Sequence, residues 1–281
     1  MKPRILSAAD IAGFERHLRR EEKSENTIKK YLRDVKLFCE FVRDKKITKD
    51  LAVKYKQSLL ERKYSARSIN SMLASVNGLF DFLGLSECKV KTVKTQKQIY
   101  CPEEKELTKQ EYARLVSAAQ RQGNGRLSMV LQTICGTGIR VSELNYITVE
   151  SLKSSNAVVR CKGKTRTVFI VKELQKKLLR YISKQQIKTG CIFITRTGKP
   201  ISRTNIWREM KALCKEANVN PAKVFPHNLR HLFARVFYNI EKDIAKLADI
   251  LGHSNINTTR IYIVSTGAEH MRRMERMRLI I

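Results

Sequence analysis

Gly136-Thr137-Gly138-Ile139-Arg140-Val141-Ser142-Glu143-Leu144 is the stretch from which the organisation of this 281-residue sequence can be worked out. Its two glycines end an apolar helical run at Cys135, and Arg140 follows directly after the break. Glu143 comes three residues later, roughly one helical turn away, where its carboxylate can orient the arginine. A guanidinium placed in this way is suited to bind an oxyanion.

Three further motifs follow in order. Pro226-His227-Asn228-Leu229-Arg230-His231 places His227 and Arg230 on one face of a predicted helix. Leu251-Gly252-His253 comes next, and Thr258-Thr259-Arg260-Ile261-Tyr262 supplies a phenol. Transfer of a phosphodiester requires a nucleophile, positive charge near the non-bridging oxygens and an acid for the leaving oxygen. Together with the lysines described next, these motifs supply all three.

Between the first two motifs the sequence predicts a β-hairpin. The segments 157–161 and 166–171 are rich in Val, Ile and Thr, and they flank the turn Lys162-Gly163-Lys164-Thr165. In a regular strand, residues two apart point to the same side, so Lys162 and Lys164 are both candidates for the acid.

The rest of the chain is predicted to be mainly α-helical and to form two domains. Apolar residues at helical spacing and Ser or Thr caps predict helices over 7–20, 24–42, 48–62 and 65–83, which can pack as one bundle. In the second domain, which is of mixed α+β type, we expect the hairpin, a short strand at 191–195, and helices over 108–120, 126–135, 172–187, 204–217 and much of the segment after 225.

These patterns give the domain boundaries. Residues 1–84 are predicted to form the helical bundle, residues 85–106 a basic linker and residues 107–281 the second domain. The linker is either a solvated connector or a strap along DNA phosphates, because four lysines alternate there with small and polar residues.

The charge of the chain points to a polyanion partner. There are 56 Lys and Arg against 26 Asp and Glu, a formal net charge of +30, and nucleic acid is the expected partner. We find no apolar stretch of about 20 residues for a membrane span and no signal peptide. The seven cysteines are never spaced as CxxC, which favours a reducing compartment, the cytoplasm.

In their order and spacing, these motifs resemble the catalytic domain of the tyrosine site-specific recombinases, the phage integrase family. T-G-I-R-V-S-E-L, H-N-L-R-H and L-G-H-S, with Tyr262 nine residues after His253, match that family's signature motifs. The first helices and the linker resemble its core-binding domain and interdomain strap. We expect no further domain before them, so the chain resembles the compact Xer-like members more than the arm-binding phage integrases.

The resemblance implies a role for each candidate residue. Arg140 and Arg230 would hold the scissile phosphate, with Glu143 behind them. His227 would act in proton transfer or hydrogen bonding, and His253 would bond a phosphate oxygen. Tyr262 would attack phosphorus to give a 3′-phosphotyrosine.

The resemblance also implies that a hairpin lysine protonates the leaving 5′-oxygen. In the common G-K-G-x-K-x-R form the first lysine has this role, and Lys162 matches it. Lys164 stays an alternative because Cys161 replaces the first glycine and the turn is one residue shorter. No metal or other cofactor is expected: the spacing of His227 and His231 suits a metal pair, but Asn228 stands where H-E-x-x-H has Glu.

The implied function is site-specific recombination at double-stranded DNA sites by a homo-tetramer on two sites, with a possible accessory directionality factor. Integration or excision of a mobile element and Xer-like chromosome resolution both fit. A DNA-binding protein without catalytic activity and a type IB topoisomerase are the alternatives. The segment 267–281 is either an ordinary capping helix or, as the resemblance implies, a helix that docks on a neighbouring protomer.

Overall fold

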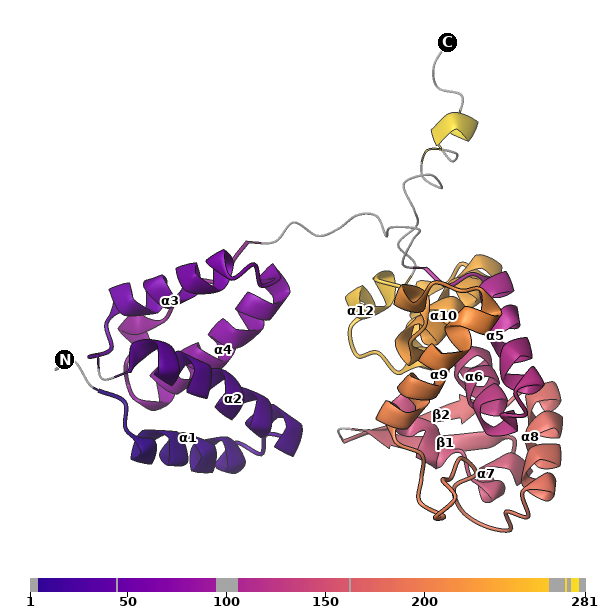
Figure 1. The fold of residues 1–281 in the computed structure, drawn as a ribbon. Helices are drawn as coiled ribbons and strands as arrows, with labels where there is room; N and C mark the ends of the chain where they lie inside the picture. The colour runs from indigo at the N-terminus through magenta and orange to yellow at the C-terminus, as the bar shows by residue number, and fades with distance from the viewer. Residues whose placement is uncertain are drawn as a thin grey trace. The chain divides into compact units, whose positions relative to one another are not determined.

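The computed structural model describes residues 5–43, 45–94, 106–161, 163–262, 271 and 274–277, and of Cys161 and Lys164 only the main chain. The chain divides into two compact units, residues 1–97 and 98–281 (Figure 1). Most described residues lie in helices, and the described strands form one two-stranded sheet. The predicted fold class, mainly α with two domains and a small hairpin, is therefore confirmed.

The first unit is a bundle of four α-helices. Each begins at a Ser or Thr whose side-chain oxygen accepts a hydrogen bond from a main-chain N–H of the first turn. Phe38, Leu73 and Phe80 are fully buried between the helices, as their helical spacing predicts. The helices are α1 (Ala8–Arg20), α2 (Glu25–Val42), α3 (Lys49–Glu61) and α4 (Ala66–Phe82).

The beginning of the predicted linker packs on this bundle. A short 3₁₀-helix, η1 (Ser86–Cys88), follows α4, and Cys88 and Val90 are buried in the core of the bundle. The side chain of Asn77 in α4 bonds both the N–H and the carbonyl of Val90. The rest of the proposed strap, residues 95–105, lies outside the described residues.

The second unit is built around α6 (Gly125–Thr137). This helix packs against four others, and Val130, Leu131 and Ile134 on it are fully buried. Its neighbours are α5 (Lys109–Arg121), α8 (Lys172–Lys184), α9 (Arg203–Ala217) and α10 (Pro226–Glu241). The smaller elements are η3 (Val141–Tyr146), α7 (Val149–Lys153), η4 (Pro221–Lys223), α11 (Ile244–Leu251) and α12 (Ile256–Arg260).

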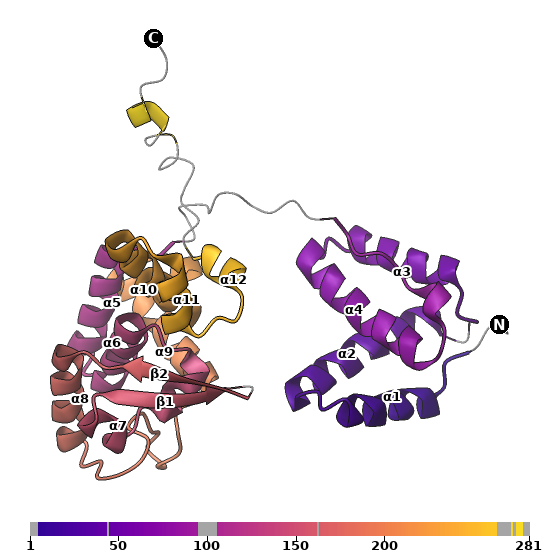
Figure 2. The ribbon, with the colours of Figure 1, turned by 180° about the vertical axis from the view of Figure 1, so that it is seen from behind.

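The hairpin is present, but its turn is tighter than predicted. Strands β1 (Asn156–Cys161) and β2 (Lys164–Phe169) pair antiparallel from Asn156↔Phe169 to Cys161↔Lys164, as Figure 2 shows from behind. Only two residues therefore connect the strands. Gly163 has a φ of 74°, the left-handed conformation that a two-residue turn favours. Lys164, predicted in the turn, belongs to β2.

The short strand predicted at 191–195 is not formed. Ile192 and Phe193 are fully buried, so the apolar residues of this segment belong to the core of the second unit. However, the main chain makes only two isolated bridges, Thr148↔Cys191 and Ile194↔Pro200. A strand requires a continuous partner, and here the partner changes after one residue.

The candidate active site

Gly138 sets the position of Arg140. Gly138 ends α6 with a φ of 65°, and a Cβ on it would lie 2.5 Å from Phe233 Cδ1 of α10. Only glycine fits that conformation and that space. The chain then turns through the buried Ile139 and presents Arg140 at the start of η3.

Glu143 holds Arg140 as predicted from the spacing. Its Oε2 accepts the main-chain N–H of Arg140 at 3.0 Å, and its Oε1 lies 2.9 Å from Arg140 Nη1. The Glu143 side chain is 2% exposed and that of Arg140 is 36% exposed. The buried carboxylate thus orients a guanidinium that remains open to a ligand.

Arg230 is 1% exposed and is held by main-chain carbonyls. Its Nη1 donates to the carbonyl of Gly138 and its Nη2 to that of Leu251, at the ends of α6 and α11. Its buried Nε has no hydrogen-bond partner among the described residues. Burial, and then the charge of Arg140, lower the pKa of Arg230 to about 10, and nearby Tyr262 opposes this shift. Arg230 is therefore still cationic at neutral pH.

His253 links Arg230 to the helix that precedes Tyr262. Its Nε2 lies 3.0 Å from Arg230 Nη2, and its Nδ1 lies 2.9 Å from Oγ1 of the buried Thr259 in α12. Because a guanidinium can only donate, Nε2 accepts and Nδ1–H donates to Thr259. Burial and then the charge of Arg230 lower the pKa of His253 to about 4, so the ring is neutral here.

Tyr262 lies among three histidines. The ring centroids of His231, His227 and His253 are 4.2, 5.4 and 5.4 Å from that of Tyr262. The Tyr262 side chain is 5% exposed. Burial lowers the pKa of His227, and it lowers that of His231 to about 4, so both imidazoles are neutral at pH 7.

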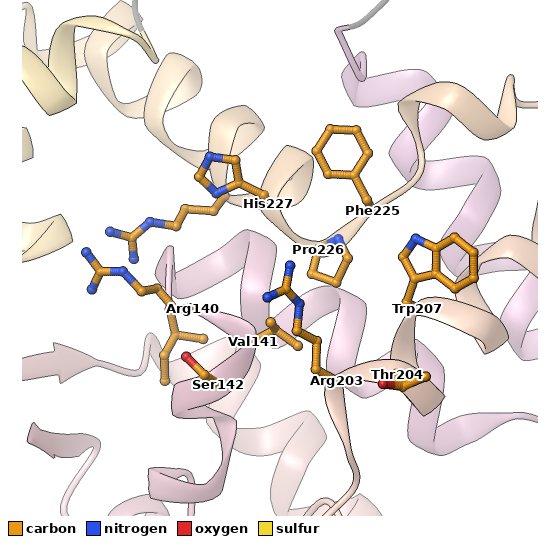
Figure 3. Close-up of a pocket in the computed structure, with 11 residues that line it drawn as sticks. Arg140, Val141, Ser142, Arg203, Thr204, Trp207, Phe225, Pro226 and His227 are labelled. Atoms are coloured by element: carbon orange, nitrogen blue, oxygen red, sulfur yellow. The ribbon is translucent and has the colours of Figure 1, made fainter. Parts of the chain in front are cut away.

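A cavity of about 480 Å³ opens beside Arg140, His227 and Arg230. Figure 3 shows Arg140 and His227 on one side of it and Arg203 and Trp207, from α9, on the other. Three guanidinium groups therefore line one hollow, which is an environment for an anion.

The structure brings five predicted residues of the second unit into one cluster. Arg140, His227, Arg230, His253 and Tyr262 come from four segments of the chain, and Glu143 lies behind Arg140. Lys162 lies outside the described residues, and for Lys164 only the main chain, in β2, is described.

Four residues of this cluster were not assigned a role from the sequence. They are Arg166, Arg203, His231 and Thr259. His231 had a visible signal, because it stands one residue after Arg230 in the second motif. Thr259 lies in the quoted motif that ends at Tyr262, only six residues after its partner His253, and Arg166 ends the hairpin motif. For Arg203 no local pattern exists, since the residues that share its cavity lie far away in the sequence.

Two structural observations concern other kinds of site. In the described part of the chain, no three or more His, Cys, Asp or Glu side chains are grouped so that they could hold a metal ion. Of the helices described, none combines the length and apolar character needed to cross a membrane.

Comparison with known proteins gives the family. Residues 105–269 match the model of the phage integrase family, and residues 11–86 match its N-terminal SAM-like domain. The tyrosine recombinase XerA of Pyrococcus horikoshii is 31% identical over 98% of this chain and 96% of its own length. The tyrosine recombinase XerD of Halalkalibacterium halodurans is 29% identical over 88% of this chain and 90% of its own.

Solved structures agree with this assignment. The crystal structure of a XerA recombinase matches with a TM-score of 0.55 and 26% identity, covering 97% of this chain and 99% of that one. A lambda integrase dimer bound to a COC′ core site shares the fold, with a TM-score of 0.74, 15% identity, and coverage of 92% and 95% of the two chains. Motifs, geometry and relatives all agree, and the chain belongs to the phage integrase family, as a tyrosine recombinase.

Proposed function

We propose that this chain cleaves and rejoins double-stranded DNA at specific sites, with Tyr262 as the nucleophile and a 3′-phosphotyrosine as the intermediate. The observation that carries the proposal is the position of Tyr262, whose ring lies against His227, His231 and His253 and beside the buried Arg230. A tyrosine buried only for packing has no need of two arginines and three histidines around it.

The two arginines would bind the non-bridging oxygens of the scissile phosphate. Arg140 is oriented by Glu143 and is partly exposed beside the cavity. Arg230 is fixed by two carbonyls at the edge of the same cavity, and its buried Nε has no hydrogen-bond partner among the described residues. Donors fixed in advance stabilise the charge that develops in the transition state without the cost of reorganisation.

The chemical step transfers the phosphoryl group and two protons. The Tyr262 oxygen bonds to phosphorus while the bond from phosphorus to the 5′-oxygen breaks. Neutral His227 can accept the phenol proton, since its lowered pKa keeps it a free base. Lys162, or alternatively Lys164, would donate a proton to the 5′-oxygen and leave a 5′-hydroxyl. The reverse reaction with another strand rejoins the DNA.

His253 would bond a phosphate oxygen once DNA is present. At present its Nε2 accepts from Arg230, so donation to phosphate requires protonation or a new partner. A bound phosphate anion favours the imidazolium, because a nearby negative charge raises the pKa of histidine.

The wider organisation follows from the same proposal. Residues 1–84 would form the core-binding domain, 85–106 the linker, whose first residues pack on that domain, and 107–281 the catalytic domain, acting in the cytoplasm. The active unit would be a homo-tetramer on two sites, in which residues 267–281 dock on a neighbour, with a possible accessory factor. XerH structures bound to a difH substrate, in pre- and post-cleavage complexes, support DNA as the partner. Mobile-element integration or excision and chromosome resolution both remain compatible.

Tyr262→Phe tests the function directly. The variant loses only the hydroxyl, so it should bind DNA nearly as well as the wild type but form no covalent adduct. A nicked suicide substrate traps the adduct, which denaturing electrophoresis detects. Tyr238→Phe, in α10, is the matched control and should retain adduct formation. An adduct formed by Tyr262→Phe would assign the nucleophile to another residue.

A further inference from the structure

Arg166 is a mostly buried arginine that the proposed chemistry leaves without a role. It lies in β2 with its side chain 13% exposed. Its Nη2 is 2.5 Å from Glu143 Oε2, and its Nη1 donates to the carbonyl of Ile250 at 3.2 Å. One guanidinium therefore joins the hairpin, the segment of Arg140 and the last turn of α11.

The carboxylate of Glu143 is shared between two arginines. One oxygen, Oε1, faces Arg140 Nη1, whereas Oε2 receives both the Arg140 main-chain N–H and the Arg166 guanidinium. Because Glu143 is 2% exposed, water cannot replace a lost partner without rearrangement. The orientation of Arg140 thus depends on a carboxylate that Arg166 also holds.

Arg166 also lies against the turn that carries His253. A Cβ on Gly252 would collide with the Arg166 side chain, so the glycine allows the arginine to pass. Gly252 has a φ of 66°, and His253 follows it directly. Arg166 also donates to the carbonyl of Ile250, which stands two residues before Gly252, so it is held at both ends of this turn.

We propose that Arg166 is a positioning residue for DNA cleavage. Through Glu143 it holds the guanidinium of Arg140 in a fixed relation to the turn that carries His253. It acts on the phosphate only through these groups. The inference rests on the proposed function, because Arg140 must bind the scissile phosphate for its orientation to matter.

The charge around Glu143 gives a readout that a purely structural role would not produce. Burial raises the pKa of Glu143, but hydrogen bonding to Arg140 and the charges of Arg166 and Arg140 lower it below its ordinary value. Asp249 and His253 line the same cavity from α11 and the turn after it. Without Arg166, one of the charges that lower the pKa of Glu143 is lost while burial still favours the protonated acid, so the pKa of Glu143 rises. A protonated Glu143 no longer offers Arg140 two anionic oxygens.

The experiment measures single-turnover cleavage of a suicide substrate at saturating DNA between pH 6 and 9. We expect Arg166→Gln to slow cleavage on the order of 10- to 100-fold. This is the loss usually seen when a residue that only orients a functional group is removed, as for residues that orient the ligands of a metal. The ratio of variant to wild-type rate should fall as the pH falls, because Glu143 becomes protonated. When Glu143 is already replaced by Gln, adding Arg166→Gln should slow cleavage much less than it does in the wild type. The additional pH dependence of the rate should also vanish.

Arg126→Gln is the matched control. Arg126 likewise donates to one carbonyl, that of Ile194, and to one carboxylate, that of Glu209, in the same unit. It lies at the first turn of α6, whereas Gly138 follows the last. We expect Arg126→Gln to lower the melting temperature without changing the cleavage rate or its pH profile.

Arg166→Lys keeps the assay informative if Arg166→Gln does not fold. Lysine keeps a positive charge beside Glu143 but lacks the second donor of arginine. The Arg166→Lys variant should therefore cleave DNA at an intermediate rate with a wild-type pH profile. Equal losses with and without Glu143, or a pH-independent ratio for Arg166→Gln, would overturn the inference. If the wild type itself formed no Tyr262-dependent adduct, the proposed function would fail instead.

Discussion

Arg140 and Arg230 have the same side chain in opposite surroundings. Arg140 is partly exposed and held by one carboxylate, whereas Arg230 is buried and held by two carbonyls. At the scale of the residue, this difference separates a contribution to cleavage from a contribution to the stability of the fold. Both arginines should contribute to cleavage, but only Arg230 should contribute strongly to the stability of the fold.

Replacement of each arginine by lysine tests this separation. Arg140→Lys and Arg230→Lys should each slow cleavage by about 10²- to 10³-fold, the usual cost of losing a fixed donor. Arg230→Lys should also lose stability, on the order of 1–3 kcal/mol for each carbonyl left without a donor. Suicide-substrate kinetics and thermal unfolding measure the two effects. Near-normal cleavage by either variant would remove that arginine from the phosphate site.

The identity of the leaving-group acid is also decided by single residues. A substrate with sulfur in place of the bridging 5′-oxygen has a leaving group that needs no proton. We expect this substrate to restore cleavage by Lys162→Ala but to have little effect on Lys164→Ala. The opposite pattern would assign the acid to Lys164, and rescue of neither would turn attention to His227.

At the scale of the element, the C-terminal end of α6 organises the site. Gly138 caps the helix in the left-handed conformation, its carbonyl accepts from Arg230, and Arg140 follows two residues later. A change at this cap therefore affects stability and the position of both arginines together.

Gly138→Ala tests the role of the cap. The left-handed conformation costs alanine about 1–2 kcal/mol, and the added Cβ would also lie 2.5 Å from Phe233. We expect lower thermal stability and slower cleavage. Gly123→Ala is the matched control, because Gly123 has a φ of 69° but no atom within 4 Å of its Cβ position. It should show only the conformational cost, with normal cleavage. Equal behaviour of the two variants would argue against the close packing at Gly138.

At the scale of the whole molecule, charge dominates. The net charge of +30 predicts DNA affinity that decreases strongly as salt increases, because each phosphate contact releases a counterion. The same surplus of cations is found locally, where Arg140, Arg203 and Arg230 line one cavity.

This charge distribution predicts that cleavage proceeds in EDTA. The arginines can balance the charge of the phosphate, and a Mg²⁺ site would require oxygen ligands such as carboxylates. The carboxylate beside Arg140, that of Glu143, is already bound by two arginines. Adduct formation should therefore be equal with EDTA and with added Mg²⁺. Activity lost in chelator and restored by a divalent ion would contradict the proposed mechanism.

The sequence by itself determined the elements and most of the candidate residues. Apolar spacing and caps are local, so α1 to α4 and α6 were predicted within a few residues of their observed bounds. The pair Arg140 and Glu143 was also predictable, because two residues three positions apart on a helical turn are neighbours. By contrast, the extent of the hairpin turn and the strand at 191–195 were wrong, since strand pairing depends on a partner outside the local pattern.

Only the tertiary structure decided which groups surround the phenol and what holds Arg230 and Arg166. Arg230 bonds the carbonyl of Gly138, 92 positions earlier, and Arg166 bonds that of Ile250, 84 positions later. Carbonyls exist at every residue, so no sequence pattern marks those that accept such bonds. The packing of α6, α10 and α11 brings these atoms together, because burial of their apolar faces fixes where each helix end lies.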